Sequence, residues 1–303
     1  MCITLISPNL EGNCITYMIK ESFKSIIKQL VSSNVIWKLM EYCFVRPVEY
    51  ARITRNALVS ASAFENRSVE ERILERLASL TVLRGPFEGL KYPEAKSIGS
   101  VIAPKLLGFY EYELQTLISA RCIGKYRTIV DIGCAEGYYA IGLGLQNPEA
   151  IVYAFDTDFQ AVAQCGKMAL VNEIGERVLT GASCTPKTLM SLELRSPCLI
   201  VCDCEGYEKE LFNEELVEKL SSSELLIELH DMVDDEIPAY IESLFHATHH
   251  SQSVFSERDD KKVEECQCEE LSGFSRDDRI SILSERRSRQ MQWVFLSPRN
   301  SGL

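Results

Sequence analysis

A regular alternation of apolar runs and helical stretches, which begins at residue 127, constrains the fold more than any other feature. Five apolar runs rich in β-branched residues follow one another: Thr128–Ile132, Ala150–Phe155, Arg177–Leu179, Cys198–Cys202 and Leu225–Glu228. The helical stretches that separate or follow them are Tyr138–Leu145, Phe159–Val171, Glu208–Phe212 and Ile237–Phe245. Apolar strands that alternate with helices are typical of a parallel sheet covered on both faces. The pattern therefore predicts a doubly wound α/β domain.

Two further strand candidates, Gln252–Phe255 and Gln292–Leu296, extend the expected sheet to seven mostly parallel strands. Between them, near residues 257–290, lies a stretch rich in Asp, Glu, Lys and Arg. Long polar connections of this kind are typical of insertions. We interpret the stretch as a mobile insertion over or beside the sheet, within a domain of residues 104–303.

Residues 1–103 are predicted to form a helical N-terminal region. Apolar positions recur at helical spacing in three stretches: Tyr17–Val31, Val35–Phe44 and Val69–Leu80. Short β-like pieces are expected near residues 82–92, and a helical stretch over Pro104–Ala120 leads into the main domain. The apolar stripes of the N-terminal helices must be buried, either within the chain or in a homo-oligomer.

The formal net charge of −12 argues against nucleic acid as a partner, because nucleic-acid binders present a basic patch. Arg286, Arg287 and Arg289 cluster late in the chain, and we interpret them as a solvated face. No apolar run approaches the roughly 20 residues of a membrane-spanning helix. The N-terminus carries no basic residue before its short apolar stretch. We therefore expect a cytoplasmic protein that does not associate with membranes.

The sequence contains twelve cysteines, which we interpret as free thiols because the chain is long enough to build a core. Two pairs have C-x-C spacing: Cys202 with Cys204, and Cys266 with Cys268. Zinc sites more often combine C-x-x-C arms, and neither pair has a suitably spaced partner. Cys202 and Cys204 are expected to share one face of a strand exit.

The run TIVDIGCAEGYYAIGLG, residues 128–144, contains the clearest binding motif. A buried strand ends at Asp131, a glycine-containing loop follows, and a helix begins near Gly137. The end of the first strand of an open α/β sheet lies at the topological switch point, where ligands bind. A dinucleotide site would show G-x-G-x-x-G, whereas the glycines here are Gly133 and Gly137. The spacing argues against a nicotinamide-dependent oxidoreductase.

The same run resembles motif I of class I S-adenosylmethionine (SAM)-dependent methyltransferases, in which an acidic residue precedes glycines at alternate positions. Asp131, Gly133 and Gly137 match this motif, and Ala135 replaces the middle glycine. The resemblance implies a Rossmann-like sheet and a SAM site formed by the loop, including Cys134.

Asp156, in VYAFDTDF, falls where this family carries an acidic residue that accepts hydrogen bonds from both ribose hydroxyls. Asp158, two residues later, is expected to cap the next helix. Upstream, PKLLGFYEYEL resembles the helix that such enzymes place against the methionine end of SAM, with Lys105 as a candidate. Further cofactor-binding residues implied by the resemblance are Thr157, Ala182, Ser183, Tyr110 and Glu111.

The fourth strand exits as LIVCDCEGYEKELF, which resembles the Asp-x-Glu-Gly-x-Glu run of the FkbM-type methyltransferases. The matching residues are Asp203, Glu205, Gly206 and Glu208. The resemblance covers roughly residues 104–256 and implies O-methylation of a hydroxyl on a small molecule, such as a sugar or natural product. An N-methyltransferase acting on an amine or peptide, and a SAM-binding protein without catalysis, are the alternatives.

Polar groups are expected to gather where the central strands end. Asp203, Glu205, His230 and Asp231 would face one crevice, with His230 as the general base because its ordinary pKa lies near neutral. Asp203 would contact SAM or the acceptor, and both Asp203 and Glu205 would assist catalysis. The alternative for His230 is a hydrogen bond to a neighbouring loop. A divalent metal is the less favoured use of these groups, so no metal ligand is assigned.

Overall fold

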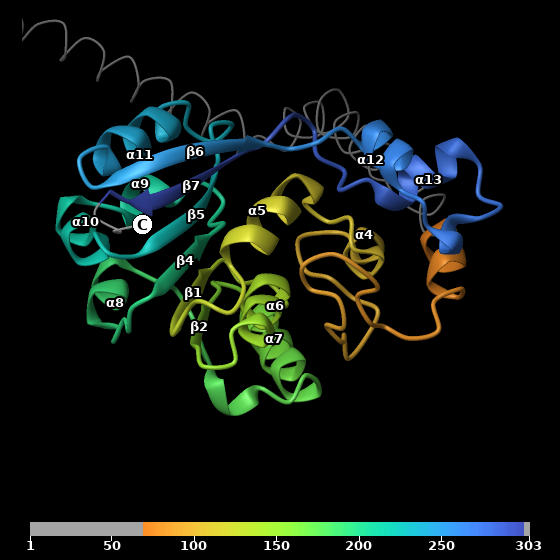
Figure 1. The fold of residues 1–303 in the computed structure, drawn as a ribbon, viewed down its shortest axis with the longest axis horizontal. Helices are drawn as coiled ribbons and strands as arrows, with labels where there is room; N and C mark the ends of the chain where they lie inside the picture. Colours follow the sequence, from red (N-terminus) through yellow and green to blue (C-terminus); the bar gives the residue numbers. More distant parts are fainter. Residues whose placement is uncertain (1–68, 300–303) are drawn as a thin grey trace, which may run out of the picture. The chain divides into compact units, whose positions relative to one another are not determined.

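The computed structural model describes residues 69–299, which fold around one seven-stranded sheet (Figure 1). The strands are β1 (Thr128–Ile132), β2 (Ile151–Phe155), β3 (Val178–Gly181), β4 (Cys198–Cys202), β5 (Glu224–Leu229), β6 (His249–Phe255) and β7 (Gln292–Pro298). Their order is β3-β2-β1-β4-β5-β7-β6, and β7 runs antiparallel to both of its neighbours. The other pairs are parallel, so the expected seven-stranded, mostly parallel sheet is confirmed.

Both faces of the sheet are buried, because successive side chains of its apolar central strands point to opposite sides. In β1, Ile129 belongs to one apolar cluster, whereas Val130 and Ile132 belong to a second. The chain leaves β1 toward β2 and β3, then crosses back to β4 on the other side of β1. The carboxyl ends of β1 and β4 therefore form the switch point that the sequence predicts.

Helices cover the two faces (Figure 1). The first cluster takes apolar residues from α5 (Gln115–Arg121), α6 (Tyr138–Gln146) and α7 (Phe159–Val171). The second takes them from α8 (Pro186–Ser191), α9 (Glu208–Leu211), α10 (Glu214–Leu220) and α11 (Ile237–Phe245). A 3-10 helix, η3 (Gly175–Arg177), precedes β3. The arrangement confirms the doubly wound fold, although the sequence does not predict α8 and α10.

The helical stretch predicted over Pro104–Ala120 is broken into three pieces. These are α4 (Ile102–Leu107), the 3-10 helix η2 (Tyr112–Leu114) and α5. Gly108 ends α4 with a φ of 74°, and a Cβ at this position would overlap the carbonyl group of Arg84. The prediction of one continuous helix is wrong because residue 108 adopts a backbone conformation that favours glycine.

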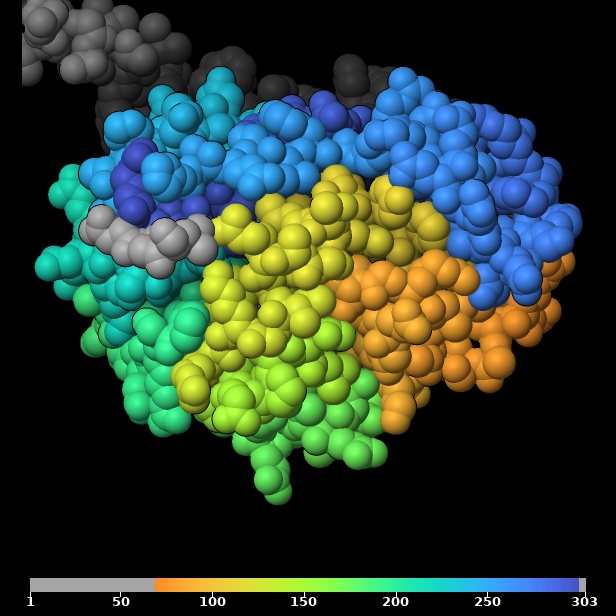
Figure 2. Space-filling model, viewed as in Figure 1, coloured from red at the N-terminus to blue at the C-terminus, as the bar shows by residue number. Residues whose placement is uncertain are grey.

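The polar stretch near residues 257–290, expected to be a mobile insertion, is folded. It contains α12 (Asp259–Glu265), the 3-10 helix η4 (Glu269–Leu271) and α13 (Arg276–Leu283). Its apolar residues, including Leu271 and Ile282, share a third cluster with Ile73 and Leu107. Figure 2 shows this blue segment beside the orange segment that begins at residue 69. A few apolar positions within a charged sequence therefore anchor the insertion.

The expected β-like pieces near residues 82–92 reduce to one bridge between Thr81 and Lys91. Val82, Phe87 and Leu90 belong to the first apolar cluster, so this segment packs against the sheet domain. The boundary at residue 103 remains a prediction. The predicted helices Tyr17–Val31 and Val35–Phe44 lie outside the described residues.

Two expectations about the surface and the thiols can be compared with residues 69–299. None of the helices in this range has the length and apolar character needed to cross a bilayer. Cys202 and Cys204 do share one face, with their sulfur atoms 3.5 Å apart. Cys266 and Cys268 are joined by a disulfide, so the prediction of free thiols is wrong for this pair. The bend after α12 brings their Cα atoms to 5.5 Å, within bridging range.

Candidate functional site

The loop between β1 and α6 is held against the exits of two neighbouring strands. The backbone N–H groups of Gly133 and Cys134 donate to the carbonyl oxygen of Phe155, at 2.8 and 2.9 Å. A Cβ on Gly133 would overlap the carbonyl oxygen of Asp203, so glycine lets the exit of β4 cross here. Ala135 has a φ of 48°, so it takes the left-handed conformation of the glycine that it replaces.

Asp156, which follows β2, organises this loop. One carboxylate oxygen accepts from the N–H of Ala135 at 2.9 Å, and the other accepts from the N–H of Asp158 at 2.8 Å. The side chain of Asp158 accepts from the N–H of Gln160, so its predicted role as the cap of α7 is confirmed. The Asp156 carboxylate is thus fixed at the switch point with lone pairs still available to a ligand.

The strand exits open into a first cavity of about 530 Å³, within the range of small-molecule sites. Eight of the twelve predicted cofactor-binding residues line it: Gly133, Ala135, Asp156, Thr157, Ala182, Ser183, Asp203 and Tyr110. They come from the ends of β1, β2, β3 and β4 and from the segment after α4. The catalytic candidate Glu205 also lines this cavity.

The other four predicted cofactor-binding residues do not line the first cavity. Asp131 and Cys134 are buried below the loop, and Gly137, with a φ of 104°, begins α6 against Cys165. Burial raises the pKa of Asp131 to about 7, and its Oδ2 has no hydrogen-bond partner among the described residues. These three residues support the loop from the side away from the first cavity. Glu111 lies elsewhere, in a second cavity.

An ion pair that the sequence motifs do not predict joins the loop to α4. Lys105 Nζ lies 2.6 Å from Glu136 Oε1, and both side chains are almost fully buried. Glu136 also accepts from the hydroxyl of Ser97 and from the N–H of Ile98, each at 2.9 Å. Although burial opposes ionisation, Lys105 and these donors hold the pKa of Glu136 below its ordinary value. The pair fixes the wall of the first cavity that contains Ile98.

A second cavity, of about 320 Å³, lies against the first. It contains His230 and two further acidic residues from distant parts of the chain, Glu111 and Glu228. Five residues line both cavities: Gly99, Ser100, Tyr110, Asp203 and Glu205. The two cavities are therefore adjacent at these five residues.

His230, at the exit of β5, is held within the second cavity. Its Nδ1 lies 2.6 Å from Oε1 of Glu208, the first residue of α9, which is fully buried. Its Nε2 lies 3.4 Å from Asp203, 3.6 Å from Glu205 and 3.7 Å from Glu228. The predicted gathering of Asp203, Glu205 and His230 is therefore observed, and His230 also contacts Glu208, which follows the loop after β4.

Asp231 does not join this group. Its carboxylate pairs with Arg289 and is partly exposed. Glu228, the residue that completes the group, lies inside a strand that reads as continuously apolar. A carboxylate near the end of a buried strand was the signal that could have identified it.

The crowding of acidic groups changes their protonation. Burial, followed by repulsion from Glu111 and Glu205, raises the pKa of Asp203 to about 7. Burial and repulsion from Asp203 raise the pKa of Glu228 to about 9. Burial alone would lower the pKa of His230, but the contact with Glu208 and the nearby carboxylates outweigh it and raise the pKa. In the free protein, this group therefore retains protons at neutral pH.

Arg287 connects the folded insertion to the second cavity. Its guanidinium donates to Glu111 and Glu228 at 2.8 Å and to Glu285 at 2.9 Å. Arg286 pairs with Glu70 at 3.5 Å, and Arg289 pairs with Asp231. The prediction that these arginines form a solvated face is wrong for Arg287, because long-range acidic partners draw it into the interior.

Backbone strain is concentrated around the two cavities. Five non-glycine residues in the described range have positive φ: Glu111, Ala135, Glu173, Glu205 and Arg286. All except Glu173 line one or both cavities. Strained conformations persist where the surroundings enforce them, and they are frequent at functional sites.

Comparisons with known proteins find only distant likenesses. No family model matches the sequence. The chain is 32% identical over 79 residues to the ribosomal RNA large subunit methyltransferase G of Photobacterium profundum. The match covers 26% of this chain and 21% of that protein, about a fifth of its length.

Two distantly similar solved structures are described as methyltransferases. The O-methyltransferase TomG of Streptomyces achromogenes, solved with SAM, is 11% identical, with a TM-score of 0.38 over 64% of this chain and 80% of that one. The precorrin-6y C5,15-methyltransferase of Geobacter metallireducens is 10% identical, with a TM-score of 0.41 over 63% and 88%. Such distant likenesses name no substrate for this chain.

Proposed function

We propose that this chain is a SAM-dependent methyltransferase that binds SAM in the first cavity and a methyl acceptor in the second. The observation that carries the proposal is the wall that the two cavities share, formed at the switch point by Asp203, Glu205, Tyr110 and Gly99–Ser100. Transfer of a small group needs donor and acceptor in contact, with their bulk in separate compartments. The shared wall provides that geometry.

The residues of the first cavity fit SAM. Asp156 presents a fixed carboxylate, the partner that two ribose hydroxyls need, and Ala182 and Ser183 offer a small surface beside it for the adenine. Tyr110 and Asp203 lie in the shared wall, where the methionine end would approach the acceptor. SAM would supply an activated methyl group on its sulfonium.

The second cavity supplies groups for proton removal. Asp203 and His230 lie 3.4 Å apart, and burial together with repulsion from Glu111 raises the pKa of Asp203 to about 7. A base is most effective when its pKa lies near the working pH. We therefore assign the acceptor proton to the Asp203–His230 pair, with Glu205 at the mouth of both cavities and Glu208 holding the imidazole.

The finer proposal is O-methylation of a hydroxyl on a small molecule, a sugar or natural product, as the FkbM-like residues imply. The second cavity is small, and its carboxylates and Arg287 offer acceptors and donors to hydroxyl groups. An amine acceptor is the second candidate, because the same carboxylates attract a cation. RNA is disfavoured, because all three clustered arginines are paired with carboxylates.

We also propose that the enzyme is cytoplasmic and that its acceptor is a small molecule. A homo-oligomer would form through the N-terminal helices.

Isothermal titration of the full chain with SAM, S-adenosylhomocysteine and NADH tests the proposal. We expect SAM and S-adenosylhomocysteine to bind and NADH not to bind. A screen with methyl-labelled SAM then compares polyhydroxylated and amine acceptors. Folded protein that binds neither sulfur ligand would overturn the proposal, and binding without transfer to any acceptor would indicate a SAM-binding protein without catalysis.

A further inference from the structure

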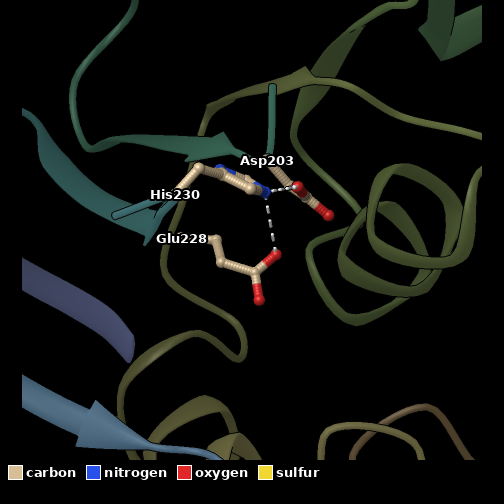
Figure 3. A group of neighbouring side chains, drawn as sticks. All are labelled: Asp203, Glu228 and His230. Carbon is tan, nitrogen blue, oxygen red and sulfur yellow. Dashed lines mark ion pairs between the residues drawn. The ribbon is translucent and has the colours of Figure 1, made fainter. Parts of the chain in front are cut away.

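We infer that Asp203, Glu228 and His230 form a binding site for one divalent cation in the second cavity, beside the shared wall. Figure 3 shows the two carboxylates converging on one ring nitrogen of His230. The three residues come from the exits of adjacent strands, β4 and β5, which the sheet topology brings together. From the sequence, a metal is the less favoured alternative, and Glu228 is not among the candidate site residues.

The separations suit a shared ion better than they suit direct hydrogen bonds. One ligand atom from each residue lies within 4.8 Å of the others. Nε2 of His230 is 3.4 Å from Asp203 Oδ1 and 3.7 Å from Glu228 Oε2. Atoms that coordinate one small divalent ion at about 2.1 Å lie about 3–4 Å apart, whereas hydrogen-bonded atoms lie at about 2.7–3.2 Å.

His230 is oriented as a metal ligand. Its side chain is 4% exposed, and Nδ1 contacts Glu208 at 2.6 Å, whose side chain is 0% exposed. A ring nitrogen bound to a buried carboxylate fixes the tautomer and directs the lone pair of the other nitrogen outward from that contact. The other nitrogen is Nε2, which points at the three carboxylates and makes no hydrogen bond with them.

Each of the two carboxylates also has an oxygen available to a cation. Asp203 Oδ1 is buried and has no hydrogen-bond partner among residues 69–299. Glu228 uses Oε1 to accept from Arg287, which leaves Oε2 facing His230. Glu228 is 6% exposed, so a buried carboxylate oxygen left without a partner there is costly. A cation would satisfy both oxygens and offset the repulsion between the carboxylates.

The donor set indicates which cation. Two carboxylate oxygens and one imidazole nitrogen suit first-row transition ions such as Mn²⁺ better than Mg²⁺, which prefers oxygen ligands. If the proposed function holds, an acceptor hydroxyl bound to the ion from the second cavity would ionise more readily. Because Asp203 and His230 would then be ligands of the ion, the proton would pass to Glu205 instead of to that pair; Glu205 is 86% exposed and lies in the shared wall.

Titration of the chelator-treated full chain with Mn²⁺ alone, followed by electron paramagnetic resonance, tests the site. We expect one tightly bound ion per chain. His230→Gln and Asp203→Asn should each weaken binding more than about 100-fold, and Glu208→Gln about 10–100-fold. Asp231→Asn is the matched control: it removes a neighbouring carboxylate paired with Arg289 and should leave Mn²⁺ affinity unchanged.

Circular dichroism shows that each variant is folded, and binding of SAM to the metal-free protein is measured in parallel. Absence of Mn²⁺ binding by protein that binds SAM would overturn the cation site alone. Equal Mn²⁺ affinity in His230→Gln and the parent protein would also overturn it. Mn²⁺ binding that depends on His230, in protein that never binds SAM, would support the site and contradict the proposed function.

Discussion

The first and second cavities share a wall, but the chain builds them differently. The first is formed where the strands β1, β2, β3 and β4 end. Its shape depends on backbone conformation, because Gly133, Ala135 and Gly137 all have positive φ. The second depends on side chains from distant segments, and Arg287 joins Glu111, Glu228 and Glu285. One site is specified locally along the sequence, and the other by long-range charge pairing.

Because the two cavities are built differently, SAM binding and methyl transfer should depend on different residues. Residues behind the first cavity should control SAM affinity and the stability of the loop. Residues of the second should control turnover and leave SAM affinity unchanged. Substitutions on each side can show whether the two cavities are as independent as their construction suggests.

The largest effect is expected for His230→Ala. Turnover should fall by about 10²–10⁴-fold, because the variant removes the group that Glu208 orients toward the acceptor, while SAM affinity should change less than about twofold. Steady-state kinetics with an acceptor from the screen and calorimetry with SAM measure the two quantities. Parent-like turnover would remove His230 from the mechanism, and a large loss of SAM affinity would show that the cavities are coupled.

Asp131→Asn tests the buried carboxyl behind the first cavity. Because folding raises the pKa of Asp131 to about 7, the folded parent holds this proton more tightly than the unfolded chain does. The stability it contributes is present below the unfolded pKa, near 4, and is lost as pH rises through about 7. The variant cannot titrate, so its stability relative to the parent should increase over this range.

Between pH 5 and pH 8 the increase should be roughly 2.5 kcal/mol, because the parent loses about 1.4 kcal/mol for each pH unit between pH 5 and the folded pKa of about 7. Urea unfolding of both proteins at pH 5 and pH 8, without SAM, gives the difference, in which the other titrating groups cancel. A stability difference that stays constant with pH would mean that Asp131 has the same pKa in both states.

Asp156→Ala should weaken SAM binding by about 10- to 150-fold, since a hydrogen bond to a charged group contributes about 1.5–3 kcal/mol. The matched control is Asp158→Ala, two residues away. It removes the cap of α7 and should cost about 1 kcal/mol of stability without changing SAM affinity. Unchanged affinity in Asp156→Ala would show that the second strand exit does not hold the ribose.

The same contrast explains what the sequence could predict. Strand exits and the motif loop have local signals, so β1, α7 and α11 are predicted at their observed bounds, and eight predicted residues line the first cavity. For Glu228 and Arg287 in the second cavity, the local signals are weaker. Glu228 reads as part of an apolar strand, and Arg287 reads as one charge in a polar stretch. Their roles depend on pairing across 59 positions of the chain.

The smallest effect is expected at Ala135, where the loop departs from the family motif. With a φ of 48°, Ala135 is strained by about 1–2 kcal/mol, which glycine would relieve. Glycine also makes the unfolded chain more flexible, at a cost of about 0.4–1 kcal/mol. Ala135→Gly should therefore stabilise the protein by up to about 1 kcal/mol in urea unfolding, with parent-like SAM affinity.

Gly133→Ala is the informative counterpart. It adds the same methyl group to a residue of the same loop, but there the Cβ would overlap the carbonyl oxygen of Asp203. The exit of β4 would have to move, so both stability and SAM affinity should fall. If Ala135→Gly proved destabilising, the alanine side chain would have to contribute contacts in the first cavity that outweigh its strain, and the loop would be shaped by side-chain packing as the second cavity is.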